Sequence, residues 1–141
     1  MPLSIRKHPA ASWKLPFSAA ELARLLQAML DEAGHSDAVV ELALLDDKDM
    51  EDLNRQSAGL TGPTNILSFP VSDDGPCLGW LALSADTLQR ESFLYGQDER
   101  EHCLRLLAHG LAHLTGLDHG PAMDSLAHRL ESAARDTLAH H

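Results

Sequence analysis

The run HGLAHLTGLDH, residues 109–119, sets three histidines and a glycine at a spacing that constrains how the chain can fold. His109 and His113 are four residues apart, so on a helix they project from one face, one turn apart. Gly116 can adopt the left-handed conformation that ends a helix, and the chain can then return His119 to the same point. Three neutral imidazoles meeting there suit Zn²⁺ or a similar divalent ion, with a fourth position open for water.

The second residue of this run separates two kinds of metal chemistry. The spacing matches the zinc-peptidase signature H-E-x-x-H-x-x-G-x-x-H, in which the Glu is the general base. Gly110 stands where that Glu would be. The run therefore predicts a metal site and argues against a metallopeptidase. The alternative is a buried helix whose histidines are only packed or capped.

Length and charge limit the architecture and the partners. The chain has 141 residues, 44% of them hydrophobic, which predicts one globular domain over residues 1–141. Its formal net charge of −10 opposes non-specific binding to nucleic acid, and DNA is not an expected partner. Any contact with RNA has to come from a few placed residues or from partner proteins.

The cysteines and the apolar runs indicate the compartment. Cys77 and Cys103 form no disulfide framework and are expected to be ordinary reduced thiols. No apolar run approaches the ~18–20 residues that span a bilayer, and the N-terminal residues lack the apolar stretch of a signal peptide. We expect a cytoplasmic protein that does not contact membranes.

Apolar periodicity and turn residues predict alternating strands and helices. Strands are expected at residues 3–6, 39–45, 64–69 and 78–83. Helices are expected at residues 18–34, 46–57, 84–93, 98–115 and 122–138, the first opened by a Ser18–Glu21 capping box. This order predicts an α/β or α+β sheet with helices on its faces.

Two stretches together resemble a known family. They are LNRQSAGLTGPTNILSFP, residues 53–70, and the histidine run at residues 109–119. In order and spacing they resemble the YbeY family, whose pattern is LN…G…PT(N/D)VLSFP, then LGD, then HGxLHLxGYDH. That family comprises bacterial metal-dependent endoribonucleases tied to 16S ribosomal RNA maturation and ribosome quality control. The resemblance extends over most of the chain, from about residue 39 to about residue 138.

The resemblance implies a fold and a site. It implies a small α+β domain with a mostly parallel sheet of about four strands, and a metal site on a helix and the following turn. It implies one zinc-like ion on His109, His113 and His119, with the strand at residues 64–69 bordering the substrate cleft. Asp118 is the nearest acid–base candidate; it could orient a ligand imidazole or simply bond the backbone of the turn.

Four positions depart from the family pattern. Ala58 replaces a usual Arg with an assigned role in RNA cleavage, Trp80 replaces an acidic residue, Gly62 replaces a Lys and Leu117 replaces a Tyr. Arg55 lies three residues before Ala58, on the same face if this segment is helical, and could grip phosphate in its place. The alternative is that Arg55 is only a solvated helix residue.

The expected function is a zinc-dependent, single-strand endoribonuclease acting in 16S ribosomal RNA 3′-end maturation. A three-histidine zinc makes hydroxide available near neutral pH, so hydrolysis of a phosphodiester does not need the peptidase Glu. Ser68 could hydrogen-bond a substrate phosphate or be an ordinary packed hydroxyl. The expected partners are ribosomal RNA and ribosomal or ribosome-assembly proteins. A second hypothesis is a non-catalytic ribosome-assembly factor with a structural metal.

Overall fold

The computed structural model describes the backbone of residues 3–7 and residues 15–58, 65–71, 75, 77–116 and 120–139. Within them lie four strands, β1 (Leu3–Lys7), β2 (Val39–Leu45), β3 (Ile66–Pro70) and β4 (Cys77–Ser84). The same residues contain five helices, α1 (Ala19–Glu32), α2 (Asp47–Ala58), α3 (Ala85–Leu94), α4 (Glu99–Leu114) and α5 (Pro121–Ala139). The expected order of strands and helices is confirmed.

The described strands form one mixed sheet in the order β1-β2-β4-β3. β1 pairs with β2, and β2 with β4, in parallel, whereas β3 pairs with β4 antiparallel as the edge strand. The α+β class is therefore confirmed. The antiparallel edge arises because β3 and β4 follow each other with only a short connection, and a parallel pair needs a longer crossover.

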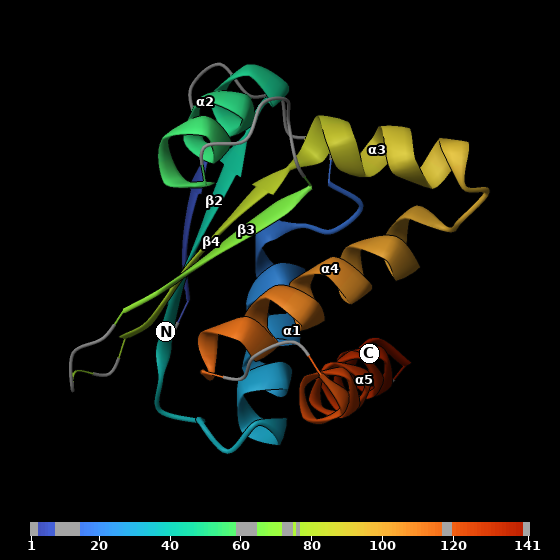
Figure 1. The fold of residues 1–141 in the computed structure, drawn as a ribbon. Coiled ribbons are helices and arrows are strands. Elements are labelled where there is room, and N and C mark those ends of the chain that lie inside the picture. The colour runs from blue at the N-terminus through green and yellow to red at the C-terminus, as the bar shows by residue number, and fades with distance from the viewer. Residues whose placement is uncertain are drawn as a thin grey trace.

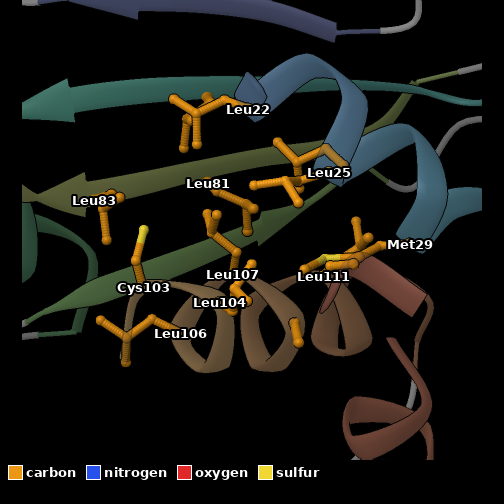
Figure 2. Close-up of a cluster of buried hydrophobic side chains, with 14 of the residues drawn as sticks. Leu22, Leu25, Met29, Leu81, Leu83, Cys103, Leu104, Leu106, Leu107 and Leu111 are labelled. Carbon is orange, nitrogen blue, oxygen red and sulfur yellow. The ribbon is translucent and has the colours of Figure 1, made fainter. Parts of the chain in front are cut away.

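Helices α1 and α4 pack against one face of the sheet, and α5 packs on α1 and α4, while α2 and α3 lie near the end of the sheet at which β2 finishes (Figure 1). β2 alternates between buried and half-buried residues, as expected for a strand with one face on the core. Figure 2 shows Leu81 and Leu83 of β4 facing Leu22 of α1 and Leu104 of α4 across that core. This packing fixes α4, and with it the histidines, against the sheet.

Helix ends are specified by polar side chains. The capping box of α1 is present, with Ser18 Oγ accepting from the Glu21 N–H at 3.1 Å and Glu21 accepting from the Ser18 N–H at 2.9 Å. Ser84 caps α3 by accepting from the Thr87 N–H at 3.1 Å. These contacts satisfy amide groups that have no partner inside the helix.

Asp47, at the start of α2, ties that helix to α3. Its carboxylate accepts hydrogen bonds from Ser84 Oγ at 2.9 Å, Thr87 Oγ1 at 2.8 Å and Arg90 at 2.9 Å. Partial burial raises the pKa of Asp47, but these three hydrogen bonds and the charge of Arg90 outweigh it and lower the net pKa. The Asp47 clamp is therefore the main polar connection that holds α2 to α3.

Candidate active site

Helix α4 presents the first two histidines of the motif. Asp98 caps its N-terminus by accepting from the Glu101 N–H at 3.1 Å. The helix ends at Leu114, and Gly116 follows with φ of +93°. The expectation that Gly116 ends the helix is confirmed, because this left-handed conformation is one that only glycine adopts without strain.

His109 and His113 lie side by side on α4, and both are half-buried. Their ring centroids are 5.3 Å apart, and the ring planes are inclined at 80°. Both face a cavity of about 550 Å³ between α4 and the edge strand β3. The described residues that line it are Asn65, Ile66, Leu67, Ser68, Pro70, His109, Gly110, His113 and Gly116.

The third predicted ligand, His119, and the acid–base candidate, Asp118, lie outside the described residues. Within the described part of the chain, no group of three or more His, Cys, Asp or Glu side chains is placed to hold a metal ion. The two described histidines nevertheless fit the ion that the motif implies. They offer two imidazole donors one helical turn apart in a single cavity, which is the borderline-soft donor set that zinc prefers.

The cavity lining is unusual for a chain with a net charge of −10. None of the described residues that line the cavity is an Asp or a Glu. Among the described residues, no carboxylate on the lining of this cavity would repel an anionic substrate, although His109 also borders a second cavity lined by Asp124 and Glu131. A divalent ion on neutral imidazoles would keep its full charge there.

Gly110 has a packing reason to lack a side chain. A Cβ at this position would lie 2.9 Å from Ile66 Cδ1, 3.0 Å from Leu81 Cδ2 and 3.3 Å from Ser68 Oγ. Ser68 Oγ donates a hydrogen bond of 3.0 Å to the Gly110 carbonyl in the same place. Helix α4 therefore lies close to β3 and β4 at the position where a peptidase would carry its Glu, and a side chain there would have to displace Ile66 and Leu81.

Arg55 does not line the cavity. Its guanidinium lies 2.5 Å from Asp52 and 4.0 Å from Glu51, both on its own helix, and its side chain is 53% exposed. This arrangement is that of a solvated helix residue in a local ion-pair cluster. The hypothesis was that Arg55 takes the place of the Arg that the family pattern has at position 58. The side chain of Ala58 lies outside the described residues.

Trp80 lies on the other face of the sheet from the histidines. Leu81 and Leu83 point toward the helices (Figure 2), so alternation along β4 directs Trp80 away from them. Its ring stacks on that of Phe69 with centroids 4.0 Å apart and planes inclined at 14°. The change from an acidic residue at this position therefore removes no charge from the described lining of the histidine cavity.

Cys103 is buried in the core beside Leu104 (Figure 2), and burial raises the pKa of its thiol to about 12. Metal ions bind the thiolate form of cysteine, and this buried thiol stays protonated at neutral pH. Cys103 therefore packs in the core and is not a metal ligand. Cys77 is half-buried on β4 and is a free thiol too. The expectation that both cysteines are unpaired is confirmed.

One polar network beside the cavity has no counterpart in the sequence expectations. Asn65 donates to Glu91 of α3 at 3.1 Å, and Glu91 is 2.9 Å from His102 of α4. Asn65 lies within the PTNILSFP stretch, one of the two motifs that resemble the family, so the sequence alone could have marked it as a candidate site residue. Glu91 and His102 lie on separate helices and have no local signal, because only the packing of α3 on α4 joins them.

Fold and site together define the class: an α+β protein with paired helix histidines in a cavity at the sheet edge. The family model for endoribonuclease YbeY matches residues 10–140. A curated relative, endoribonuclease YbeY of Nitratidesulfovibrio vulgaris, is 42% identical, covering 89% of this chain and 88% of the relative. The Oleidesulfovibrio alaskensis endoribonuclease YbeY is 43% identical, with 88% and 87% covered. The chain belongs to the endoribonuclease YbeY family.

A solved structure supports the fold independently. The solution structure of the protein TM1509 from Thermotoga maritima superposes with a TM-score of 0.69, covering 98% of this chain and 92% of that one at 18% identity. In the described part of this chain, no helix combines the length and the apolar character needed to cross a membrane.

Proposed function

We propose that this chain is a zinc-dependent endoribonuclease that hydrolyses single-stranded RNA, acting in 16S ribosomal RNA 3′-end maturation and in ribosome quality control. One observation supports this most strongly. Two histidines one turn apart share a cavity whose described lining has no carboxylate, in a chain of the endoribonuclease YbeY family. Such a cavity suits an anionic strand.

The proposed metal ligands are His109, His113 and His119, and the proposed ion is a single Zn²⁺, with other divalent transition metals as substitutes. When bound, such an ion supplies Lewis acidity toward the phosphoryl oxygen and makes hydroxide available near neutral pH. The missing peptidase Glu is consistent with this proposal, because the close packing at Gly110 disfavours a side chain there while leaving both described histidines in the cavity.

The chain's own residues have distinct proposed roles. Asp118 would hold or move a proton beside the third histidine. Ser68 Oγ donates to the Gly110 carbonyl, so its role is to keep β3 against α4 as the wall of the cavity. Arg55 is the least supported member of the site, because it is already paired with Asp52 and Glu51.

A second candidate function is a non-catalytic ribosome-assembly factor in which the metal is structural. The observation that favours it is electrostatic. The net charge is −10, and Arg55, the candidate cation for gripping phosphate, is ion-paired with carboxylates of its own helix. Under either function, the proposed partners are ribosomal RNA and ribosomal or ribosome-assembly proteins, and the proposed location is the cytoplasm.

The test is cleavage of single-stranded ribosomal RNA fragments by zinc-loaded protein. The His113→Ala variant removes a proposed ligand, and His35→Ala, in the turn after α1, removes a histidine away from the cavity. We expect the wild type and His35→Ala to cleave, and His113→Ala to lose activity by at least about 100-fold while keeping its helical circular dichroism. Equal cleavage by His113→Ala would reject the enzyme. Tight binding to a ribosomal protein without cleavage would favour the assembly factor.

A further inference from the structure

A line of hydrogen bonds runs from the cavity wall into the packing between α3 and α4. Asn65 donates to Glu91 Oε1 at 3.1 Å, and Glu91 Oε1 lies 2.9 Å from His102 Nε2. The Arg105 guanidinium lies 3.4 Å from His102 Nδ1 and donates to Gln97 at 2.5 Å. The side chain of His102 is only 8% exposed and that of Glu91 22%. Partly buried polar groups are costly unless their hydrogen bonds are satisfied, so this network is a specific feature of the fold.

The direction of each hydrogen bond follows from chemistry. A guanidinium can only donate, so His102 Nδ1 accepts from Arg105 and the ring proton is assigned to Nε2. His102 Nε2 then donates to Glu91. Glu91 Oε1 therefore accepts from both His102 and Asn65, and Asn65 Nδ2 also lies 3.4 Å from Glu91 Oε2.

The Asn65 side chain is held at both ends. Its Nδ2 donates to Glu91, and its Oδ1 accepts from the Ile66 N–H at 2.7 Å. Its backbone carbonyl accepts from the Ser84 N–H at 3.0 Å, which pins the residue to the end of β4. An amide has two N–H donors and a carbonyl with two lone pairs. Nδ2 is also 3.4 Å from Glu91 Oε2, and a single N–H can serve both oxygens of one carboxylate. Among the described residues, one donor and one lone pair of Asn65 therefore remain for a group in the cavity that it lines.

The chemistry of that group is restricted. It must accept one hydrogen bond and donate one. It must also be neutral, because the negative carboxylate of Glu91 stands directly behind the amide and repels a second anion. A hydroxyl group meets these conditions, and a phosphate oxygen does not. The group that distinguishes RNA from DNA is the ribose 2′-hydroxyl, which is both donor and acceptor.

We propose that Asn65 recognises a ribose 2′-hydroxyl of the strand bound beside His109 and His113, and that Glu91 and His102 are positioning residues that orient its amide. This inference rests on the proposed RNA-cleaving function and deepens it. It makes Asn65 a specificity-determining residue, which selects RNA over DNA through one sugar rather than through the bases.

The test uses a single-stranded RNA oligonucleotide and a series in which one ribose at a time is replaced by deoxyribose. Dissociation constants are measured by fluorescence anisotropy and kcat/KM by cleavage, for the wild type, Asn65→Ala and Glu91→Gln. The control is Gln27→Ala, which removes an amide that donates to a carboxylate on α1, away from the cavity. Circular dichroism and thermal melting check each fold.

We expect one deoxyribose position to weaken the wild type by about tenfold, the effect of one or two net hydrogen bonds. Asn65→Ala should lose about the same factor on all-ribose RNA and be insensitive to that position. Glu91→Gln should show an intermediate loss, and Gln27→Ala none. If Asn65→Ala does not fold, Glu91→Gln decides: reduced sensitivity at that position supports the proposal, and full sensitivity overturns it.

Two results overturn the inference: a wild type insensitive to every deoxyribose, or an Asn65→Ala variant weakened equally on all substrates. The second is the outcome of a purely structural role. A wild type that binds RNA with the expected sensitivity but never cleaves it rejects the proposed enzyme and keeps the inference. Cleavage without any such sensitivity keeps the enzyme and rejects the inference.

Discussion

Ser68 on β3 donates a hydrogen bond of 3.0 Å to the backbone carbonyl of Gly110 on α4. This carbonyl directly follows His109 in the chain, so the contact fixes the helix against the sheet edge beside the candidate site. The same close approach accounts for a glycine at position 110, because a Cβ there would contact Ile66, Leu81 and the Ser68 hydroxyl. The packing that forms the cavity wall is thus the same packing that disfavours a side chain at the position of the peptidase base.

The first prediction concerns this close approach. Gly110→Ala should gain about 1 kcal/mol from helix propensity and lose about 1–3 kcal/mol from overpacking, a net destabilisation of about 1 kcal/mol. Ile66→Val removes the Cδ1 atom that the new Cβ would meet at 2.9 Å. The free energy of unfolding of both single variants and of the double variant is measured by urea denaturation. The double variant should lose less stability than the sum of the losses of the two single variants. Strict additivity would contradict the described packing.

The second prediction concerns the Asp47 clamp and pH. The pKa of Asp47 is lowered from its ordinary value of 3.8 in the folded protein, so the unfolded chain binds this proton more readily. The stabilisation is therefore fully present above about pH 4 and is lost as pH falls through the lower, folded-state pKa. Asp47→Asn should cost about 1–2 kcal/mol at pH 7, because it weakens three hydrogen bonds.

The measurement is the free energy of unfolding of wild type and Asp47→Asn in urea between pH 7 and pH 3. The gap between the two proteins should be constant down to about pH 4 and shrink below it. The exposed Asp37 provides a control, since Asp37→Asn should show no such gap. A gap that widens as pH falls has the wrong sign for this clamp.

The third prediction separates stability from activity at Trp80. Trp80→Asp introduces the kind of residue usual in the family but removes the ring that stacks on Phe69. It should destabilise the protein by about 2 kcal/mol through lost stacking and apolar burial, whereas Trp80→Phe should keep most of the stability. Thermal melting measures both. RNA cleavage by Trp80→Phe should match that of the wild type, because Trp80 is not among the described residues that line the histidine cavity. A large loss of activity would contradict the placement of Trp80 away from the site.

Local sequence patterns predicted the elements well, because caps and periodicity are local signals. The Ser18 capping box, the strand at residues 39–45 and the left-handed Gly116 all appear where expected, although that strand alternates between buried and half-buried residues. The position of Arg55 was harder to predict. Its nearest carboxylates on the same helix compete for it, and sequence spacing alone does not say which partner a long side chain takes.

The candidate site was predictable only in part, for a similar reason. The H-x3-H spacing places His109 and His113 together because helix geometry is regular. The wall that faces them comes from β3, about 40 residues earlier in the sequence, and the Glu91–His102 contact depends on how two helices pack. The sequence pattern shows that Trp80 replaces an acidic residue, but only strand pairing and alternation reveal which face of the sheet it occupies.

The most direct test of the account is a zinc titration of RNA cleavage by metal-free protein. We expect no cleavage without metal and a linear rise in activity that stops at about one equivalent of zinc per chain, since one ion is proposed. His113→Ala should stay inactive at one equivalent, and the His35→Ala control should follow the wild type. Cleavage that is independent of zinc, or equal in His113→Ala and wild type, would contradict the claim that the histidine cavity is the catalytic centre.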